Sequence, residues 1–346
     1  MKVARLLFEK ITSLSQIFQG WDQFRRGKRK KKDVQHFERH LEDNIFQLQY
    51  DLTTFQYKHG IYEQFYVTDP KQRHISKAPV RDRLVHQVVY DVLTDALDRK
   101  FIFHSLSCRL GKGTHIGVAQ LQGMIRKVSA NGKLPCYALK MDIRRFFDTI
   151  DHEILKGLLR KQIQDEHALK IIDMIIDSFV VKETSEGALG IPLGNVTSQF
   201  FANLYLHELD DFIKQSLRER YYLRYCDDFI ILANDEVHLR SLILIIQEFL
   251  SKCLRLQLHP KKLIVRKLNR GIDFVGYVLF EKYIVTRTRT KQRMKNRLKI
   301  MYEDYLVGKI DAALMDQKLQ SYLGILSHAN QHALSIALKN AYWVRK

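Results

Sequence analysis

The sequence predicts an α+β fold in which a central sheet carries helices packed on one face. Strand-like and helix-like segments alternate through residues 136–280. Two runs rich in aromatic and branched residues, Tyr221–Tyr225 and Phe229–Ala233, flank a tight turn and so predict a strand–turn–strand unit. Residues 1–60 and 292–346 have a mostly helical pattern. Together these observations predict a sheet-containing centre between two helical regions.

Each element of the first half follows from a local pattern. Asp69-Pro70 is a turn signal that bounds a strand-like piece around Phe65–Thr68. The elements expected after it are a helix over Asp82–Arg99, a second helix that follows Gly111-Lys112-Gly113-Thr114 and runs to about Ser129, a short apolar strand over Tyr137–Met141 that ends at Asp142, and helix over residues 152–181.

The second half alternates loop, helix and strand. Gly187–Gly194 is expected to be a loop, and Thr197–Ser216 a helix, because its apolar residues recur at helical spacing. After the strand–turn–strand unit, Leu239–Leu254 is strongly apolar and amphipathic, which predicts another helix. Short strands are expected around Leu263–Arg266 and Phe274–Leu279.

Bulk composition indicates a globular protein that handles nucleic acid. The 346 residues allow about two to three domains. Hydrophobic residues make up 46% of the chain, which is typical of globular rather than disordered proteins. The net charge of +19, from 57 Lys+Arg against 38 Asp+Glu, attracts polyanions, with nucleic acid expected before acidic membranes.

The same survey predicts an intracellular location. The longest apolar runs have five residues, far short of the ~20 that a membrane-spanning helix needs. The first 18 residues lack the apolar block of a secretory signal. The four cysteines form no CxxC pair, which indicates a reducing compartment and no zinc framework. We expect a cytoplasmic protein.

Three acidic residues are the main candidates for chemistry. Asp142 ends one predicted strand, and Asp227 and Asp228 occupy the turn of the later hairpin. Adjacent carboxylates repel one another unless a polyvalent cation lies between them. Phosphoryl transfer with two metal ions uses a few carboxylates to hold the ions roughly 4 Å apart. The alternative is an ordinary polar β-turn, since Asp is favoured in turns.

The residues around these acids resemble the motifs of reverse transcriptases. Leu139–Asp148 (LKMDIRRFFD) resembles the first palm motif, and Tyr225-Cys226-Asp227-Asp228 resembles the YxDD motif. Other segments follow in the family's order: Lys71–Ile75, Asp82-Arg83, Cys108–His115, Leu258–Lys262 and Gly271–Tyr277. Several ordered motifs are a far stronger signal than any single one.

The resemblance implies a right-hand polymerase fold, in which the sheet is an antiparallel palm and the tail a helical thumb. The implied division is an N-terminal helical and basic extension over residues 1–60, fingers over 61–135 with a return over 152–190, palm over 136–285 and thumb over 286–346. The implied cofactors are two Mg²⁺ ions, for which Mn²⁺ can substitute.

One segment distinguishes branches of the family. Ile191–Gln199 (IPLGNVTSQ) has an aliphatic residue before the Gly and Ser-Gln at its end, where most reverse transcriptases have QGxxxSP. This pattern resembles the enzymes of diversity-generating retroelements, which are bacterial, archaeal or phage-encoded. They copy a template-repeat RNA into cDNA with errors concentrated at adenines, and the cDNA replaces a variable region of a target gene. They work with a small basic pentameric accessory protein.

Two other functions stay open. The first is another stand-alone bacterial reverse transcriptase, such as one serving in phage defence. The second is a non-enzymatic RNA-binding scaffold, which the three acids disfavour. From its length, we expect the chain to lack the maturase and endonuclease domains of group II intron proteins.

The resemblance also assigns roles to individual residues. Asp142, Asp227 and Asp228 would be the catalytic metal ligands, together with the main-chain carbonyl of Ile143. Phe147 would exclude a ribose 2′-hydroxyl, whereas Phe146 is expected in the core. The remaining residues expected at the dNTP are Lys71, Arg73, Leu193, Gly194, Gln199 and Lys262. The residues expected to contact nucleic acid are Arg83, Lys112, Gly276, Tyr277, Arg289, Lys291 and Arg293.

Two basic segments support a nucleic-acid ligand. Seven of the eight residues in 25–32 are basic, and we expect them to contact an RNA backbone or an acidic partner. In residues 286–346, 12 Lys or Arg residues stand against 4 Asp or Glu. Basic residues recur there at every second position from Arg287 to Lys299, which would share one face of a strand through Lys291 and spread around a helix thereafter. This charge suits a clamp on the phosphates of a template–primer duplex.

Overall fold

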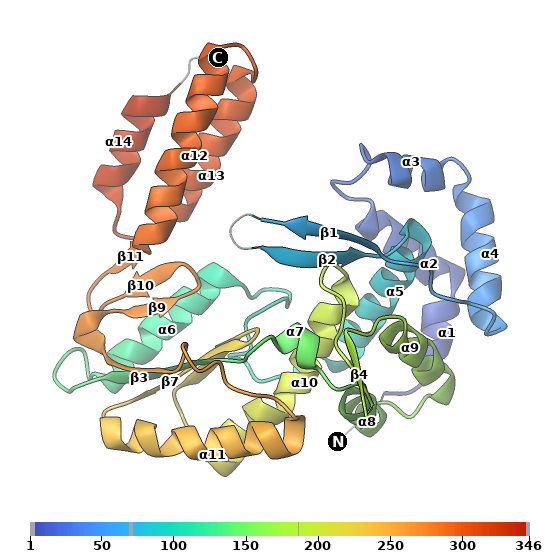
Figure 1. Cartoon of the computed structure of the whole chain (residues 1–346), viewed down its shortest axis with the longest axis horizontal. Helices are drawn as coiled ribbons and strands as arrows, with labels where there is room; N and C mark the ends of the chain where they lie inside the picture. Colours follow the sequence, from blue (N-terminus) through green and yellow to red (C-terminus); the bar gives the residue numbers. More distant parts are fainter. Residues whose placement is uncertain (1–3, 69–71, 186, 344–346) are drawn as a thin grey trace.

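The computed structural model describes residues 4–68, 72–185 and 187–343. The chain begins with a helical layer that packs around a long fifth helix (Figure 1). The five helices are α1 (Leu7–Thr12), α2 (Leu14–Phe24), α3 (Lys32–Glu38), α4 (Leu41–Thr53) and α5 (Val80–Leu97), and η1 (Asp98–Lys100) follows them. The prediction of mostly helix over residues 1–60 is therefore confirmed.

Small and apolar residues explain how these helices pack. Ile17 and Trp21 on α2 and Leu84 and Val88 on α5 are all buried in one core. At Gly20, an added Cβ would lie 2.7 Å from Cγ2 of Val88, so the two helices cross at a distance that only glycine allows. The basic block of residues 25–32 forms the turn between α2 and α3 and ends at Lys32, the first residue of α3.

A two-stranded ribbon extends from this helical layer (Figure 1). Strand β1 (Glu63–Val67) pairs antiparallel with β2 (Arg73–Lys77). The sequence pattern missed β2 because its five residues include one apolar side chain, Ile75. The amide of Ser76 in β2 donates to the carbonyl of Leu193 at 2.9 Å, which attaches the ribbon to the distinctive 191–199 segment.

The segment over residues 146–189 packs back against the N-terminal helices. It contains α7 (Phe146–Thr149), α8 (His152–Gln162), α9 (Glu166–Asp177) and the paired strands β4 (Lys182–Thr184) and β5 (Gly187–Leu189). Residues 152–181 are mostly helical, as predicted, but they form two helices rather than one, because Asp165 caps a new helix by accepting from the amide of Ala168. The predicted loop at Gly187–Gly194 likewise begins with a short strand.

The central sheet has four antiparallel strands in the order β6-β7-β3-β8. Their bounds are β3 (Tyr137–Asp142), β6 (Tyr222–Tyr225), β7 (Asp228–Ala233) and β8 (Ile264–Lys267). Helices α10 (Val196–Asp211) and α11 (Glu236–Leu254) follow the predicted positions, and α10 ends in the π-helical turn η2 (Phe212–Ser216). The antiparallel α+β architecture predicted from the sequence is therefore confirmed.

The sheet is covered on both faces, so the prediction of helices on one face is wrong. Phe229 and Ile231 face a core shared with α10 and α11, whereas Ile230 and Leu232 face a core shared with α6 (Thr114–Val128). Alternate residues of a strand point to opposite faces, and burial of both faces explains the unbroken apolar run in β7.

A small second sheet lies beyond α6. Strands β9 (Ile272–Phe274), β10 (Tyr277–Leu279) and β11 (Ile284–Thr286) form an antiparallel sheet in the order β11-β10-β9, and η3 (Leu268–Arg270) precedes it. The single strand predicted over Phe274–Leu279 is in fact a hairpin that turns at Val275-Gly276. Gly276 has φ 96°, the left-handed region that glycine adopts without strain.

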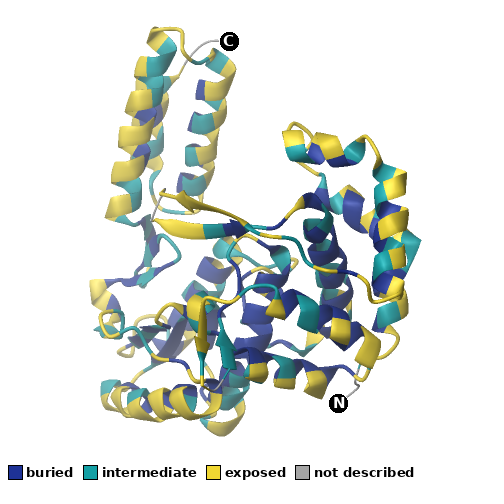
Figure 2. Ribbon diagram, turned by 45° about the vertical axis from the view of Figure 1, so that its right-hand side comes forward, coloured by how far each residue is buried: buried dark blue, intermediate teal, exposed yellow. Residues whose placement is uncertain are grey.

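The chain ends in a helical unit with a core of its own (Figure 2). Its helices are α12 (Thr288–Leu306), α13 (Ala312–Ser327) and α14 (His332–Tyr342). Because α12 already begins at Thr288, the strand expected through Lys291 does not form. Among the described residues, no helix is long and apolar enough to cross a membrane.

Candidate active site

The antiparallel pairing of β3 with β7 brings the three candidate acids together. Asp142, the last residue of β3, lies directly opposite Asp228, the first residue of β7. Asp227, the residue before Asp228, is the second residue of the two-residue turn that joins β6 to β7. Cys226, the first residue of that turn, has φ 55°, a left-handed conformation that is uncommon for a residue other than glycine. The hairpin therefore holds both acids at the tip of a buried sheet.

Burial makes this acidic group unfavourable without a counter-charge. Burial raises the pKa of Asp228 to about 6. The Asp142 and Asp227 carboxylates also raise this pKa, whereas Lys140 lowers it. Burial raises the pKa of Asp227 as well, again with a contribution from Asp142. Protonation of Asp228 as the pH falls through about 6 would compete with binding of a cation, which favours the ionised form.

Two lysines pair with the carboxylates. The Nζ atom of Lys262 donates to both oxygens of Asp142, at 2.7 and 2.8 Å. The Nζ atom of Lys140 lies 2.8 Å from Oδ2 of Asp228. The sequence analysis missed Lys140, although a lysine two residues before Asp142, in an otherwise apolar strand, shares its face of the sheet. Lys262, which is expected at the dNTP, therefore lies against the acids.

The acids retain capacity for a divalent cation. Within the described ranges, no three His, Cys, Asp or Glu side chains are already arranged to hold a metal ion. However, Oδ1 of Asp228 is buried and has no hydrogen-bond partner. Carboxylate oxygens are the ligands that Mg²⁺ prefers, and an unpartnered buried carboxylate oxygen is costly. The donor set therefore fits a hard divalent cation.

A cavity of about 560 Å³ surrounds the acids. Most of the residues expected at the metal or the dNTP line it: Arg73, Asp142, Ile143, Phe147, Leu193, Gly194, Gln199, Asp227, Asp228 and Lys262. These residues come from positions spread over the whole middle of the chain. Their convergence on one cavity is the geometric basis for calling it the candidate active site.

Phe147 and Phe146 differ in burial, as the sequence predicts. Both rings line the cavity, but Phe146 is buried in the core, whereas Phe147 is partly exposed. The carbonyl of Phe147 accepts a hydrogen bond from the amide of Ile191 at 2.9 Å. This contact joins the first acidic motif to the 191–199 segment, so Phe147 and Leu193 are held on walls of the same cavity.

The 191–199 segment is fixed by one hydrogen bond within it and by another to strand β2. The hydroxyl of Ser198 donates to the carbonyl of Pro192 at 2.6 Å, and the amide nitrogen of the Asn195 side chain donates to the carbonyl of Ser76 at 2.9 Å. Gly194 has φ 119°, and a Cβ there would lie 2.9 Å from Ile75. Gln199 is exposed on the first turn of α10.

The residues expected to contact nucleic acid lie outside this cavity. Arg83 donates to Asp33 at 2.6 Å, and the Nζ atom of Lys112 lies 3.3 Å from the ring centre of Phe103. The hydroxyl of Tyr277 donates to the carbonyl of Ile325 at 3.0 Å, which joins the second sheet to α13. The other expected positions are the turn residue Gly276 and, on α12, Arg289, Lys291 and Arg293. Lys71 lies outside the described residues.

Comparison with known proteins identifies a family. The family model described as "Reverse transcriptase (RNA-dependent DNA polymerase)" matches residues 58–279, which is more than half of the chain. All the cavity residues named above fall inside the matched region.

Individual relatives match smaller parts of this chain. The "Uncharacterized 91 kDa protein in cob intron" of Schizosaccharomyces pombe is 29% identical over 136 residues, which are 39% of this chain and 16% of that protein. Protein YkfC of Escherichia coli is 20% identical over 249 residues, 61% of this chain and 64% of its own length. The group II intron-encoded protein LtrA of Lactococcus lactis is 38% identical over 84 residues, 21% of this chain and 13% of LtrA. The chain thus spans less than two thirds of each of these relatives.

Proposed function

The chain belongs to the reverse transcriptase (RNA-dependent DNA polymerase) family, and from this premise we propose that it is an RNA-directed DNA polymerase of a diversity-generating retroelement. It would copy a template-repeat RNA into cDNA with errors concentrated at template adenines, and the cDNA would diversify a target gene. The observation that carries the polymerase is the set of three acids in a cavity with Arg73 and Phe147. The retroelement type is supported by the Ile191–Gln199 segment.

The fold supports a division into the parts of a right-hand polymerase. The central sheet with its three acids corresponds to a palm over residues 136–285. The ribbon and the helices α5, α8 and α9 correspond to fingers over 61–135 and 152–190, and the C-terminal helical unit to a thumb over 286–346. Helix α6, although it falls within 61–135, packs on the palm sheet. Residues 1–60 would form an additional helical and basic extension.

Each cavity residue has a proposed task in nucleotide addition. Asp142, Asp227 and Asp228, with the carbonyl of Ile143, would hold two Mg²⁺ ions, which supply activation of the 3′-hydroxyl and neutralisation of the triphosphate. The guanidinium of Arg73 would bind the triphosphate oxygens, with Lys71 as a second cationic group. Separately, Lys262 would give a proton to the departing pyrophosphate.

The proposed partners follow from the same function. They are the template RNA, the RNA–cDNA duplex, dNTPs and a small basic pentameric accessory protein. The deciding experiment is cDNA synthesis on a structured, adenine-containing RNA with Mg²⁺, dNTPs and the accessory protein, followed by sequencing of the errors. Misincorporation concentrated opposite template adenines supports the proposal. An even, low error rate at all four bases would instead identify a reverse transcriptase with another role.

An intron-type reverse transcriptase is the second candidate, because relatives with matched segments include group II intron-encoded proteins. The error experiment separates it from the first candidate, since a polymerase that must copy its own intron faithfully has no use for adenine-directed errors. A stand-alone enzyme serving in phage defence would give the same even error pattern.

Leu193→Gln is expected to lower the misincorporation rate opposite adenine by about tenfold. Leu193 lines the cavity and has no polar group with which to check the nascent base pair. A well-placed polar contact contributes about 1–3 kcal/mol of discrimination. Sequencing of cDNA from wild type and variant measures the change. Leu193→Met, which stays aliphatic, is the matched control and should keep the wild-type spectrum; an unchanged spectrum in Leu193→Gln rejects the role of this side chain.

Arg289→Ala with Arg293→Ala is expected to weaken binding of an RNA–DNA duplex and to flatten its salt dependence. Both residues are exposed on α12, and a spacing of four places them on one helix face. Removal of each cationic side chain that binds a phosphate reduces the slope of log affinity against log salt by about one.

Duplex affinity measured across a salt series tests this clamp. Lys291 is also among the residues expected to contact nucleic acid, but it is partly buried on the side of α12 opposite Arg289 and Arg293. Lys291→Ala is therefore the internal comparison and should change the salt slope less than the double variant does. Equal salt slopes for the wild type and the double variant would show that α12 does not bind the duplex.

A further inference from the structure

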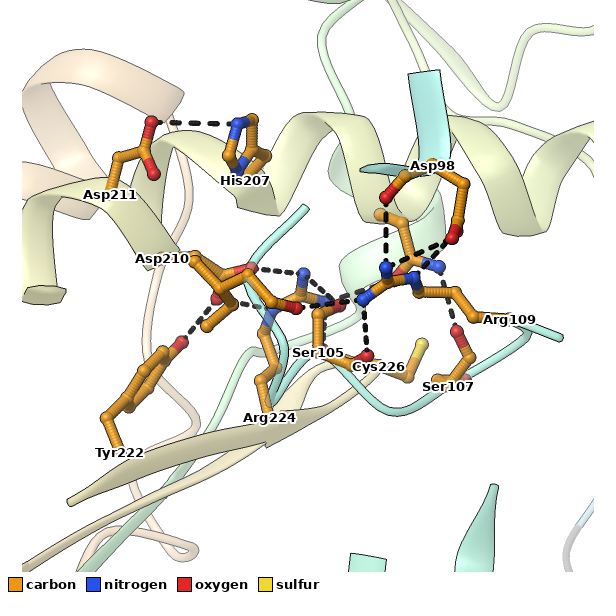
Figure 3. A network of polar contacts seen from close by, with 12 residues as sticks. Asp98, Ser105, Ser107, Arg109, His207, Asp210, Asp211, Tyr222, Arg224 and Cys226 are labelled. Carbon is orange, nitrogen blue, oxygen red and sulfur yellow. Dashed lines mark hydrogen bonds and ion pairs between the residues drawn. The ribbon is translucent and has the colours of Figure 1, made fainter. Parts of the chain in front are cut away.

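A network of polar and charged contacts joins Arg224 and Asp210 to Cys226, in the turn between β6 and β7 (Figure 3). The side chains of Arg224 on β6 and Asp210 on α10 are both 0% exposed. The Nε and Nη2 atoms of Arg224 donate to the two carboxylate oxygens of Asp210 at 2.7 and 2.6 Å. The hydroxyl of Tyr222 also donates to this carboxylate, at 2.6 Å. Arg224 is therefore held in a single orientation by a two-pronged ion pair.

The other donors of Arg224 reach three different segments. Nη1 donates to the carbonyl of Cys226 at 3.1 Å and to Oδ1 of Asn203 at 3.3 Å, and Nη2 donates to Oγ of Ser105 at 3.0 Å. With the two bonds to Asp210, all five N–H groups of the guanidinium have acceptors. One side chain thus connects α10, the loop before α6 and the turn between β6 and β7.

We propose that Arg224 is a positioning residue, which fixes the peptide between Cys226 and Asp227 and so sets the geometry in which Asp227 and Asp228 bind divalent cations. The Cys226 carbonyl belongs to the peptide that leads directly into Asp227. Cys226 has φ 55°, so this turn needs an outside contact to keep its conformation. The contact with Nη1 of Arg224 supplies one.

The same network also holds a second segment of the cavity wall. The carbonyl of Arg224 accepts from the amide of Leu106 at 2.9 Å, and the Asn203 side chain donates to the carbonyl of Ser107 at 2.9 Å. Ser107 and Cys108 line the cavity that contains the acids. Loss of the Arg224 side chain would remove its contacts with Cys226, Ser105 and Asn203, and would therefore loosen both the turn and the loop that carries Ser105 and Ser107.

A gain in stability alone does not explain the buried ion pair between Arg224 and Asp210. A buried ion pair can often be replaced by apolar side chains of similar volume without loss of stability, because removing both charges from water is costly. The fork geometry of arginine is what allows one group to bind Asp210 and the turn carbonyl together, and lysine has neither the fork nor five donors. Arg224→Lys thus keeps the charge and loses the geometry.

The test measures Mn²⁺ binding to the full chain without nucleic acid, by electron paramagnetic resonance. The Asp227→Asn variant defines the signal that belongs to the site. Arg224→Lys is expected to raise the Kd for Mn²⁺ by about tenfold, as loss of a group that orients metal ligands commonly does. The Mg²⁺ concentration needed for half-maximal cDNA synthesis should rise in parallel, while the KM for template stays unchanged.

General destabilisation has its own control. Leu48→Ala removes a buried side chain of α4 in the N-terminal helical layer and should lower the urea midpoint without changing Mn²⁺ affinity. A folded Arg224→Lys protein with wild-type Mn²⁺ affinity and a lowered urea midpoint would show that Arg224 is merely structural. If Arg224→Lys does not fold, Asp210→Asn takes its place, because the amide keeps the shape of the carboxyl but binds the guanidinium less tightly. Unchanged Mn²⁺ affinity in that variant would equally reject the inference.

The inference rests on the proposed function only through cation binding by the acids. Mn²⁺ binding requires no template, so the two ideas fail separately. A wild type that binds Mn²⁺ through Arg224-dependent geometry but makes no cDNA would overturn the polymerase proposal alone. A wild type that makes cDNA while Arg224→Lys binds Mn²⁺ normally would overturn the positioning role alone.

Discussion

Asp227→Asn is expected to abolish cDNA synthesis while RNA binding persists. The substitution replaces a half-buried carboxylate in the turn by a neutral amide of nearly the same shape, so the hairpin should fold as before. Removal of one preorganised electrostatic interaction in a catalytic site lowers kcat by about 10²–10³-fold, and removal of a charge that binds the metal should reach at least the upper end of that range. Primer extension and an RNA-binding assay on the same preparation measure the two properties.

The control is Asp235→Asn, in the connection between β7 and α11. The Asp235 side chain caps α11 by accepting from the amide of Val237, and asparagine caps helices about as well as aspartate. This variant should keep full activity. Activity of Asp227→Asn within tenfold of the wild type would contradict the assignment of this carboxylate to catalysis. Loss of RNA binding together with activity would indicate a damaged fold instead.

The central strands could be predicted from the sequence because their signals are local and strong. Apolar runs on both sides of Cys226-Asp227 predicted β6 and β7, and the antiparallel register then placed Asp142 opposite Asp228. Helices with clear apolar periodicity, such as α10 and α11, were likewise predicted within a few residues. In these segments propensity, pattern and tertiary packing all favour the same structure.

Other elements could not be predicted because their stability comes from partners far away in the chain. Strand β2 has one apolar residue and is held by pairing with β1 and by the contact between Ser76 and Leu193. The burial of both faces of β7 depends on α6, which precedes it by about a hundred residues. An apolar run alone does not say which element covers each face.

The residues of the candidate site also fall into those that the sequence predicted and those that it did not. The acids, Arg73, Phe147 and the 191–199 segment were found because ordered motifs resemble a family. Lys140 and Arg224 were missed because each is a single charged residue within an apolar strand, and the sequence does not show which group will neutralise it. Their partners, Asp228 and Asp210, became visible only when the chain was folded. A charged residue inside a predicted buried strand should therefore be treated as a candidate for the site.

Phe147→Ala is expected to raise the incorporation of ribonucleotides relative to deoxyribonucleotides by about 100-fold. Phe147 lies on the cavity wall with the three acids, and its ring is the bulky group expected to contact the 2′ position of an incoming sugar. Its removal would leave room for a hydroxyl. A pocket that selects mainly by shape provides about 10²-fold discrimination against an added hydroxyl, and this is what truncation to alanine should remove. The ratio of kcat/KM for a matched rNTP and dNTP measures it.

The neighbouring ring provides the control for this prediction. Phe146 is buried and packs against Phe147 with ring centres 5.4 Å apart. Phe146→Leu should lower stability by about 1 kcal/mol, as volume-conserving core substitutions do, and leave sugar selection unchanged. If both variants relax sugar selection equally, the effect comes from a shifted backbone rather than from the Phe147 ring. If neither does, the cavity selects deoxyribonucleotides by a group other than Phe147, and the assignment of this residue as the gate is wrong.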